Sequence, residues 1–317
     1  MPQTLWFLLL PGFSMMGLMS AIEPLRVANR SCGELYRWQL LSQDGAAVAS
    51  SNGMSLNVDG ALETAGDCHT LFVVAGFDPL ATFDARLAHW LHRIERKGAL
   101  LGGIDTGSFV LAQAELFSTQ RLTLHWEAIG AFQERYPHLS VTQELFEIDG
   151  KRITSAGGTA SLDLILTLIG RDHGEALAVA ISEQFVVGRI RSRQDHQRMQ
   201  IASRYGIHNK KLVQVVSAME RHSEQPLNSH ELAELINVTP RQLERLFRQH
   251  LSETPSAFYL ALRLDRARQL LRQTDMSVLE VGVACGFESS SYFSRCYRSR
   301  FATCPSQDRH ELATAER

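Results

Sequence analysis

Residues 229–305 limit the possible fold more than any other stretch, because they contain one short pattern twice. The first copy predicts a helix capped by Ser229, followed by a two-residue turn at 237–238. Thr239 can cap a second helix, and Pro240 suits its first position, where the missing N–H of proline is not needed. We therefore predict a helix–turn–helix.

The second copy begins at Ser277, which can cap another helix, and Gly286 suits the sharp end of that helix. One of the serines at 289–291 then starts the next helix. A strongly periodic segment at 256–273 predicts a helix between the copies, with a length of roughly 27 Å at about 1.5 Å per residue. Successive turns of B-DNA are about 34 Å apart. One chain could thus place two reading helices in adjacent major grooves without dimerising.

Polar and basic residues lie on the predicted outer faces of the two reading helices. From 241 to 300 we count ten arginines and six acidic residues, although the whole chain has a net charge of −2. We predict groove contacts for Gln242, Arg245, Ser291, Tyr292 and Arg295, phosphate contact for Arg298, and further DNA contacts for Arg241, Arg248 and Ser290. The alternative for this set is an ordinary solvated helix face.

This stretch resembles the AraC/XylS family of bacterial transcription regulators. The resemblance covers about a quarter of the chain and is carried mainly by the segments at 263–271, 281–287 and 292–295. The family usually has glycine at two helix ends, where this chain has Ser252-Glu253 and Ala302. Because glycine relaxes such positions, the two departures are expected to lower stability without removing the fold.

The N-terminal part alternates buried strands with helices. We predict strands at 5–10, 36–41, 70–75, 99–104, 122–125, 145–148 and 152–155, with a short edge strand at 54–58. Helices are expected at 15–29, 80–97, 107–116, 126–136, 159–173 and 175–191. This order predicts a doubly wound, flavodoxin-like α/β domain, in which ligands bind at the carboxyl ends of the strands. The C-terminal domain is expected to be all-α.

We place the α/β domain at 1–188, a polar linker at 189–211 and the DNA-binding domain at 212–310. The five cysteines are scattered without metal-binding spacing, which favours reduced thiols in a cytoplasmic protein. No metal or cofactor is predicted. The short apolar start runs into Pro11-Gly12 and indicates a core strand, and no apolar run is long enough for a membrane span.

Residues 103–107, Gly-Ile-Asp-Thr-Gly, have the spacing of a nucleophile elbow, with Asp105 where an enzyme would have Cys or Ser. Together with Glu23 and His125-Trp126, the elbow resembles PfpI-type domains of the class I glutamine amidotransferase-like fold over residues 4–188. Catalytic members combine an acid, a Cys and a His. Since the chemistry of these members requires a thiolate, the resemblance implies that this domain is not an enzyme.

A PfpI-like domain joined to an AraC module resembles the GlxA-type regulators, particularly members that respond to arginine, carnitine, glycine betaine and related amines. The resemblance implies a small amino-acid or quaternary-amine effector. The predicted effector contacts are Phe13, Ser14, Glu23, Phe77, Asp105, Thr106, His125, Trp126, Gly158 and Thr159.

Each of these predicted contacts has a plainer alternative. Asp105 could only cap a helix, Glu23 could be an ordinary exposed residue, and His125 could be a core histidine. Aromatic residues such as Trp126 could cage a quaternary ammonium, at about 0.5–2 kcal/mol each, or simply fill the core or its rim. The backbone N–H groups after Gly157 could bind a ligand carboxylate or form a plain turn.

We therefore expect a cytoplasmic, ligand-responsive activator of catabolic genes that binds double-stranded operator DNA and works with RNA polymerase. Its N-terminal domain would bind the effector and could also form a homodimer. The first alternative is a PfpI-like hydrolase or amidotransferase with a DNA-binding tail. The second is an architectural DNA binder that responds to no ligand.

Overall fold

The computed structural model describes residues 1–64, 66–274 and 276–309. The chain divides into two compact units, one ending at Gln197 and the other starting at Arg198, and each is described separately below. The division falls inside the segment 189–211 that we expected to be a linker. Every helix within the described ranges is too short or too polar to cross a membrane.

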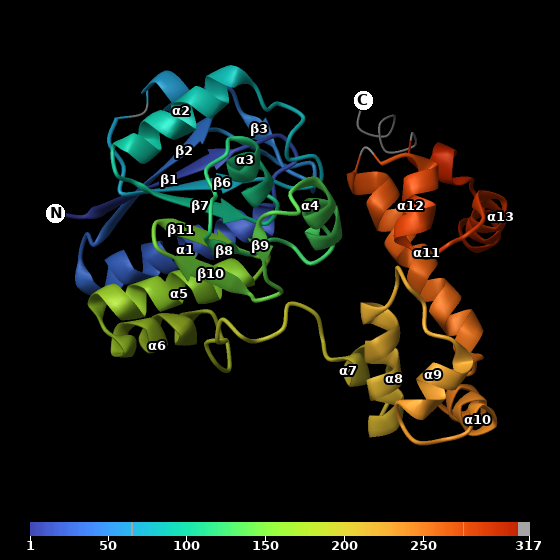
Figure 1. Ribbon diagram of the computed structural model, residues 1–317. Coiled ribbons are helices and arrows are strands. Elements are labelled where there is room, and N and C mark those ends of the chain that lie inside the picture. Colours follow the sequence, from blue (N-terminus) through green and yellow to red (C-terminus); the bar gives the residue numbers. More distant parts are fainter. Residues whose placement is uncertain (65, 275, 310–317) are drawn as a thin grey trace. The chain divides into compact units, whose positions relative to one another are not determined.

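The first unit is built on a seven-stranded sheet with the strand order β10-β11-β7-β6-β1-β2-β5 (Figure 1). All neighbouring strands are parallel except β10 and β11. The strands are β1 (Gln3–Leu9), β2 (Tyr36–Ser42), β5 (Gly60–Ala61), β6 (Thr70–Val74), β7 (Leu100–Ile104), β10 (Phe146–Asp149) and β11 (Arg152–Ser155). Two small sheets pair β3 (Val48–Ala49) with β4 (Ser55–Leu56) and β8 (Arg121–Leu122) with β9 (Ser140–Val141).

Helices cover both faces of this sheet (Figure 1). Side chains of β1 alternate between two cores, since Trp6 and Leu8 join one cluster and Leu5, Phe7 and Leu9 join the other. The first cluster includes α2 (Ala85–Arg96), α3 (Ser108–Gln113) and α4 (Ile129–Arg135). The second includes α1 (Met15–Cys32), α5 (Ala160–His173) and α6 (Glu175–Gln184). The predicted doubly wound α/β fold is confirmed.

Several predicted elements are shorter than expected. The helix predicted from residue 80 begins after Asp84, whose carboxylate accepts a hydrogen bond from the Leu87 amide at 2.7 Å. Of the strand predicted at 122–125, only Leu122 is in a strand, β8, which belongs to a small sheet outside the main one. The other predicted residues form the loop before α4, which places His125 on a loop and not on a strand.

The second unit is all-helical, as predicted, and its reading elements form two helix–turn–helix motifs. Its helices are α7 (Ile201–Tyr205), α8 (Lys210–Arg221), α9 (Ser229–Glu234), α10 (Pro240–Leu251), α11 (Pro255–Gln273), α12 (Val278–Ala284) and α13 (Ser290–Phe301). There are two separate cores, and α11 belongs to both. Phe258 and Tyr259 pack in the first, and Leu264, Ala267 and Leu270 pack in the second.

The helix caps explain where the reading helices begin. Thr239 and Ser277 are N-caps, as predicted, and each also forms a reciprocal capping box. The prediction that Ser229 caps α9 is wrong, because Asn228 is the cap and the Glu231 carboxylate accepts a hydrogen bond from the Asn228 backbone N–H. Ser252 and Ala302 have φ angles of 59°, so both substitute for glycine in the left-handed region.

Candidate functional site

Asp105 occupies the sharp turn between β7 and α3. Its φ angle is 63°, a value that asparagine and aspartate tolerate better than most residues. A side chain at Gly103 would lie 2.6 Å from the Ser108 amide, and one at Gly107 would lie 2.0 Å from the Val73 carbonyl oxygen. The two glycines are therefore required by the close approach of neighbouring backbone, and the turn holds Asp105 as an elbow holds a nucleophile.

Three other segments meet at this turn. The Ser14 hydroxyl, at the start of α1, lies beside the Asp105 carboxylate and lowers its pKa by favouring the ionised form. The backbone amide of His125 donates to the Asp105 carbonyl at 3.3 Å. Gly157 lies so close that a Cβ there would be 2.5 Å from the Asp105 carboxylate. Ser14, Asp105, His125 and Gly157 define what we call the Asp105 site.

Burial raises the pKa of the Asp105 carboxyl from 3.8 to about 6. The charge of His125 and the hydrogen bond from Ser14 act in the opposite direction, whereas Glu127 adds to the increase. No lysine or arginine among the described residues forms an ion pair with Asp105. The ionised form of this carboxylate is therefore disfavoured, and a bound cation would stabilise it.

The loop after β8 forms one wall of the Asp105 site. His125 is about one-third exposed, and its Nδ1 lies 4.0 Å from a Glu127 carboxylate oxygen. The rings of His125 and Trp126 are 5.7 Å apart, and Trp126 is partly buried against the core around α2 to α4. Both rings therefore retain exposed surface.

The start of α5 forms a second wall of the Asp105 site, since Gly157 lies next to the Asp105 carboxylate. Gly158 has a φ angle of 52°, and Thr159 begins the helix without a side-chain cap. The Thr159 hydroxyl instead accepts a hydrogen bond from the Arg191 guanidinium at 2.8 Å.

Four predicted effector contacts lie in other surroundings. Phe13 is completely buried in the second core, and Thr106 is buried with its hydroxyl donating to the Gly76 carbonyl. Phe77 is 67% exposed. Glu23 is 38% exposed and forms an ion pair with Arg26 at 2.7 Å. Of the ten predicted contacts, the structure places Ser14 and His125 beside Asp105.

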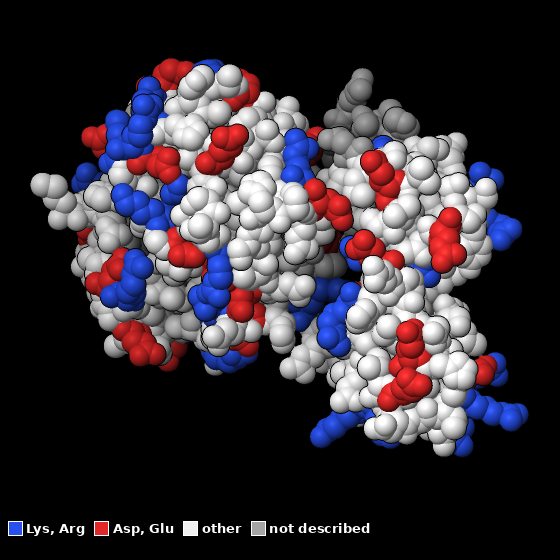
Figure 2. Space-filling view, in the orientation of Figure 1, with Lys and Arg blue, Asp and Glu red and all other residues white. Residues whose placement is uncertain are grey.

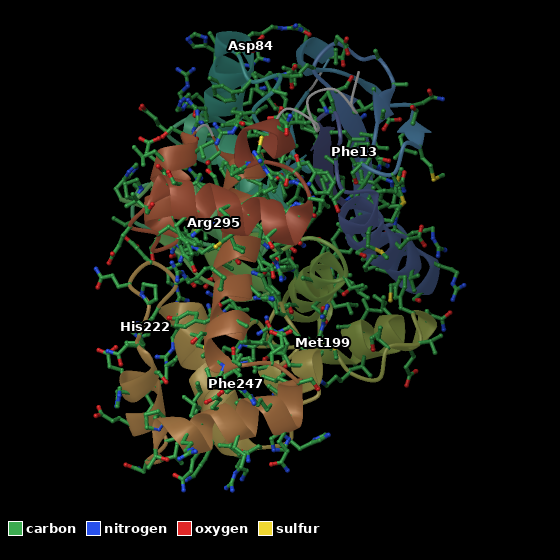
Figure 3. All side chains as sticks on the ribbon, turned by 90° about the vertical axis from the view of Figure 1, so that its right-hand side faces the viewer. Phe13, Asp84, Met199, His222, Phe247 and Arg295 are labelled. Carbon is green, nitrogen blue, oxygen red and sulfur yellow. The ribbon has the colours of Figure 1, made fainter. Side chains whose placement is uncertain are left out.

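The predicted DNA contacts all lie on exposed surfaces of the reading helices. On α10, Leu243 and Phe247 are buried while Arg241, Gln242, Arg245 and Arg248 are exposed. On α13, Phe293 and Tyr297 are buried while Ser290, Ser291, Tyr292, Arg295 and Arg298 are exposed. Figure 3 labels Phe247 and Arg295 on these helices, and Figure 2 shows Lys and Arg side chains projecting from the part that holds α9 and α10.

Some of these side chains already have partners. The Gln242 carbonyl oxygen accepts from the Thr239 amide at 2.9 Å, which leaves the NH₂ group of Gln242 available to donate. Arg248 pairs with Glu244 at 2.8 Å, and Arg295 lies 5.5 Å from the centre of the Tyr292 ring. These contacts orient the side chains along the helix surface.

Two buried clusters that the sequence did not reveal hold the second motif in place. Arg263 donates to the Cys285 and Gly286 carbonyls at 2.8 and 2.6 Å and lies 4.2 Å from the Phe287 ring centre. It thereby satisfies carbonyls at the end of α12. Asp308 is fully buried and accepts from Arg268, Arg272 and the Tyr297 hydroxyl. The position of α13 depends on both clusters.

The second unit also contains a cleft of about 360 Å³ between the start of α9 and α11. Tyr259, Arg263 and Tyr292 line it, together with Leu227, Leu232 and Leu260. None of the ten predicted effector contacts lies there.

Two helix–turn–helix motifs on one chain, each presenting an exposed polar and basic helix, define a DNA-binding regulator. The comparisons with known proteins agree. Residues 4–171 match the DJ-1/PfpI family, and residues 232–311 match a helix-turn-helix domain.

The chain is 68% identical over 312 residues to the HTH-type transcriptional regulator CdhR of Pseudomonas aeruginosa, covering 98% of this chain and 93% of CdhR. It is 38% identical over 306 residues to the regulator GlxA of Rhizobium meliloti, covering 96% and 94%. An AraC family transcriptional regulator from Pseudomonas putida matches 58% of this chain and all of its own, with a TM-score of 0.54 and 26% identity. The chain belongs to the AraC family of transcription regulators, in the GlxA-type subgroup with a DJ-1/PfpI domain.

Proposed function

We propose that this regulator senses a small cationic metabolite, an amino acid or a quaternary amine, at the Asp105 site and in response activates catabolic genes. It would act in the cytoplasm with RNA polymerase, and the α/β unit could form a homodimer. The observation that carries the proposal is the carboxylate at the elbow, which has no Lys or Arg partner among the described residues and whose pKa is raised by burial.

A cation would stabilise this site by pairing with ionised Asp105. Coulombic attraction is stronger at a partly buried site than in water, since fewer water molecules screen the charges. The exposed ring surface of Trp126 could add a cation–π contact of about 0.5–2 kcal/mol. A carboxylate on the same ligand could bind the backbone N–H groups of Gly158 and Thr159 at the start of α5.

A melting-shift screen of the full-length chain against amino acids, betaines and polyamines tests this proposal. All four tryptophans, at positions 6, 38, 90 and 126, belong to the α/β unit, so their fluorescence reports the melting of that unit alone. A ligand at 100 times its dissociation constant should stabilise the unit by about 2.7 kcal/mol. Asp105→Asn should lose the shift while still binding operator DNA. An unchanged shift in this variant would remove Asp105 from the sensing site.

The elbow geometry also supports testing the enzyme alternative. A carboxylate can serve as a nucleophile in some enzymes, but the Asp105 turn lacks the thiol on which PfpI-type chemistry depends. We expect no turnover of amide, ester or glyoxal substrates. Robust activity that disappeared in Asp105→Ala would contradict our assignment of a sensor.

A further inference from the structure

Residues 189–197, which we call the exit strap, follow α6 and are the last residues of the α/β unit. We predicted a polar linker over 189–211, but residues 189–197 are attached to the α/β unit along their length. The Arg193 carbonyl accepts from the Leu145 amide at 3.0 Å, and the Arg193 guanidinium lies 3.2 Å from the buried Glu147 carboxylate. The strap therefore belongs to the α/β unit that contains the Asp105 site.

Arg191 attaches the strap to the α5 wall of the Asp105 site. Its backbone amide and guanidinium donate to the two oxygens of Asp163, with distances of 2.6 to 2.9 Å. Asp163 is almost fully buried one turn into α5. The same guanidinium donates to Thr159, two residues beyond the Gly157 that touches Asp105. A movement of the start of α5 would therefore pull on the strap.

Gln197 attaches the strap to the His125 wall. Its NH₂ group lies 2.9 to 3.1 Å from three acceptors, the Thr123 hydroxyl and the carbonyls of Leu124 and Glu144. The next residue after Leu124 is His125, whose amide donates to the Asp105 carbonyl. Both walls of the site are thus linked to the strap by direct hydrogen bonds.

The Gln197 attachment is incomplete. Two N–H donors cannot fully satisfy three acceptors, and the Gln197 carbonyl oxygen is buried without a hydrogen-bond partner among the described residues. An unsatisfied buried acceptor weakens the attached state relative to a released one. The strap can therefore exist in an attached and a released arrangement. A ligand can shift the balance between two such arrangements if it binds one of them better.

We propose that the exit strap couples occupancy of the Asp105 site to DNA binding, with Gln197 and Arg191 as the positioning residues. This inference rests on the proposed sensing function. Ligand contact with the His125 loop and the α5 start would change how these walls hold the strap, immediately before the chain enters the DNA-binding unit.

Gln197→Leu tests the coupling in the full-length chain, with Gln194→Leu as the matched control. Gln194 is exposed in the same strap, and its side chain makes no hydrogen bond to any residue that the structure describes. We would measure affinity for a DNA duplex that the wild-type chain selects from a random pool. Without any effector, Gln197→Leu should change this affinity at least threefold while Gln194→Leu leaves it unchanged. Equal affinities for both variants and the wild type would overturn the proposal.

L-carnitine, glycine betaine and L-arginine serve as probes for the response itself. Gln197→Leu should bind a probe within threefold of the wild-type affinity, yet the probe should no longer alter its duplex affinity. A wild-type response in Gln197→Leu would overturn the coupling role. If no probe binds the wild type, the proposed effector class fails instead, and the effector-free comparison still decides the role of the strap.

A second perturbation acts on the site without any ligand. Gly157→Ala would force a Cβ against Asp105, whereas Gly53→Ala has nearly the same φ, 83° against 81°, and open space around it. Hydrogen exchange of the 189–197 peptide should accelerate severalfold in Gly157→Ala but not in Gly53→Ala. Unchanged strap exchange, with altered exchange of the 103–107 elbow, would show that the site and the strap are not coupled. If Gly157→Ala does not fold, the comparison of Gln197→Leu with Gln194→Leu decides whether the strap couples the site to DNA binding.

Discussion

Replacing Asp105 with Asn should make the stability of the α/β unit less dependent on pH. Asn keeps the size of the side chain and tolerates the φ angle of 63°, so the elbow should be retained. In the wild type, the folded site prefers the neutral acid, because burial raises the pKa of Asp105 from 3.8 to about 6. The stabilisation that this preference gives is complete below about pH 4 and is lost as the pH rises through about 6.

The magnitude follows from the size of the pKa increase. A change of about 2 units corresponds to about 3 kcal/mol at 1.36 kcal/mol per unit. Because Asp105 retains some exposure to solvent, screening should reduce the effect to about 1–2 kcal/mol. The free energy of unfolding of Asp105→Asn, relative to the wild type, should therefore increase by this amount between about pH 4 and pH 7.5.

Urea unfolding followed by tryptophan fluorescence measures this difference, since all four tryptophans are in the α/β unit. The Ser14 interaction favours the ionised carboxylate, and its effect is already contained in the pKa of about 6, so the comparison needs no separate allowance for it. The result that would refute this account is a constant stability difference over the whole pH range. Such a result would mean that the pKa of Asp105 is not raised in the folded chain.

Three further changes concern the DNA-binding unit. Arg295→Ala should weaken binding to the selected duplex by roughly 1–3 kcal/mol in a fluorescence-anisotropy titration, and an equal loss on random DNA would make Arg295 a phosphate contact. Asp308→Ala should cost about 3–5 kcal/mol of helical-unit stability by circular dichroism, because it leaves Arg268 and Arg272 without their buried acceptor. Ala302→Gly should raise thermal stability by about 0.5–1 kcal/mol, since φ is 59°, whereas Ala261→Gly inside α11 should lower it.

Local sequence patterns predicted the elements that depend on local interactions. The apolar run of β1 and the caps at Thr239 and Ser277 were found because the responsible residues are adjacent in the chain. Asn228 could have been found in the same way, since Glu231 stands three residues later in a capping-box pattern. The prediction of Ser229 as the N-cap did not take the pairing of Asn228 with Glu231 into account.

The meeting of the site residues depends on the order of strands in the sheet. Gly103 and Gly107 identified the elbow, but Ser14 and Gly157 reach Asp105 only because β1, β6, β7 and β11 are neighbours, and His125 reaches it from the loop after β8, outside the main sheet. No local pattern encodes that order. The same reason applies to residues 189–197, whose polar composition resembles a linker and whose partners are distant in the sequence.

The continuity of α11 has a consequence for the operator. Its 19 residues contribute to both cores, so one rigid helix connects the two reading motifs of a single chain. The outward residues of α10 and α13 differ, and each half of the target must therefore have its own base sequence. A regulator of this design reads DNA with a direction, so its target need not be a palindrome. One residue inserted into α11 would rotate one motif by roughly 100° relative to the other, so the two reading helices would no longer face the DNA together.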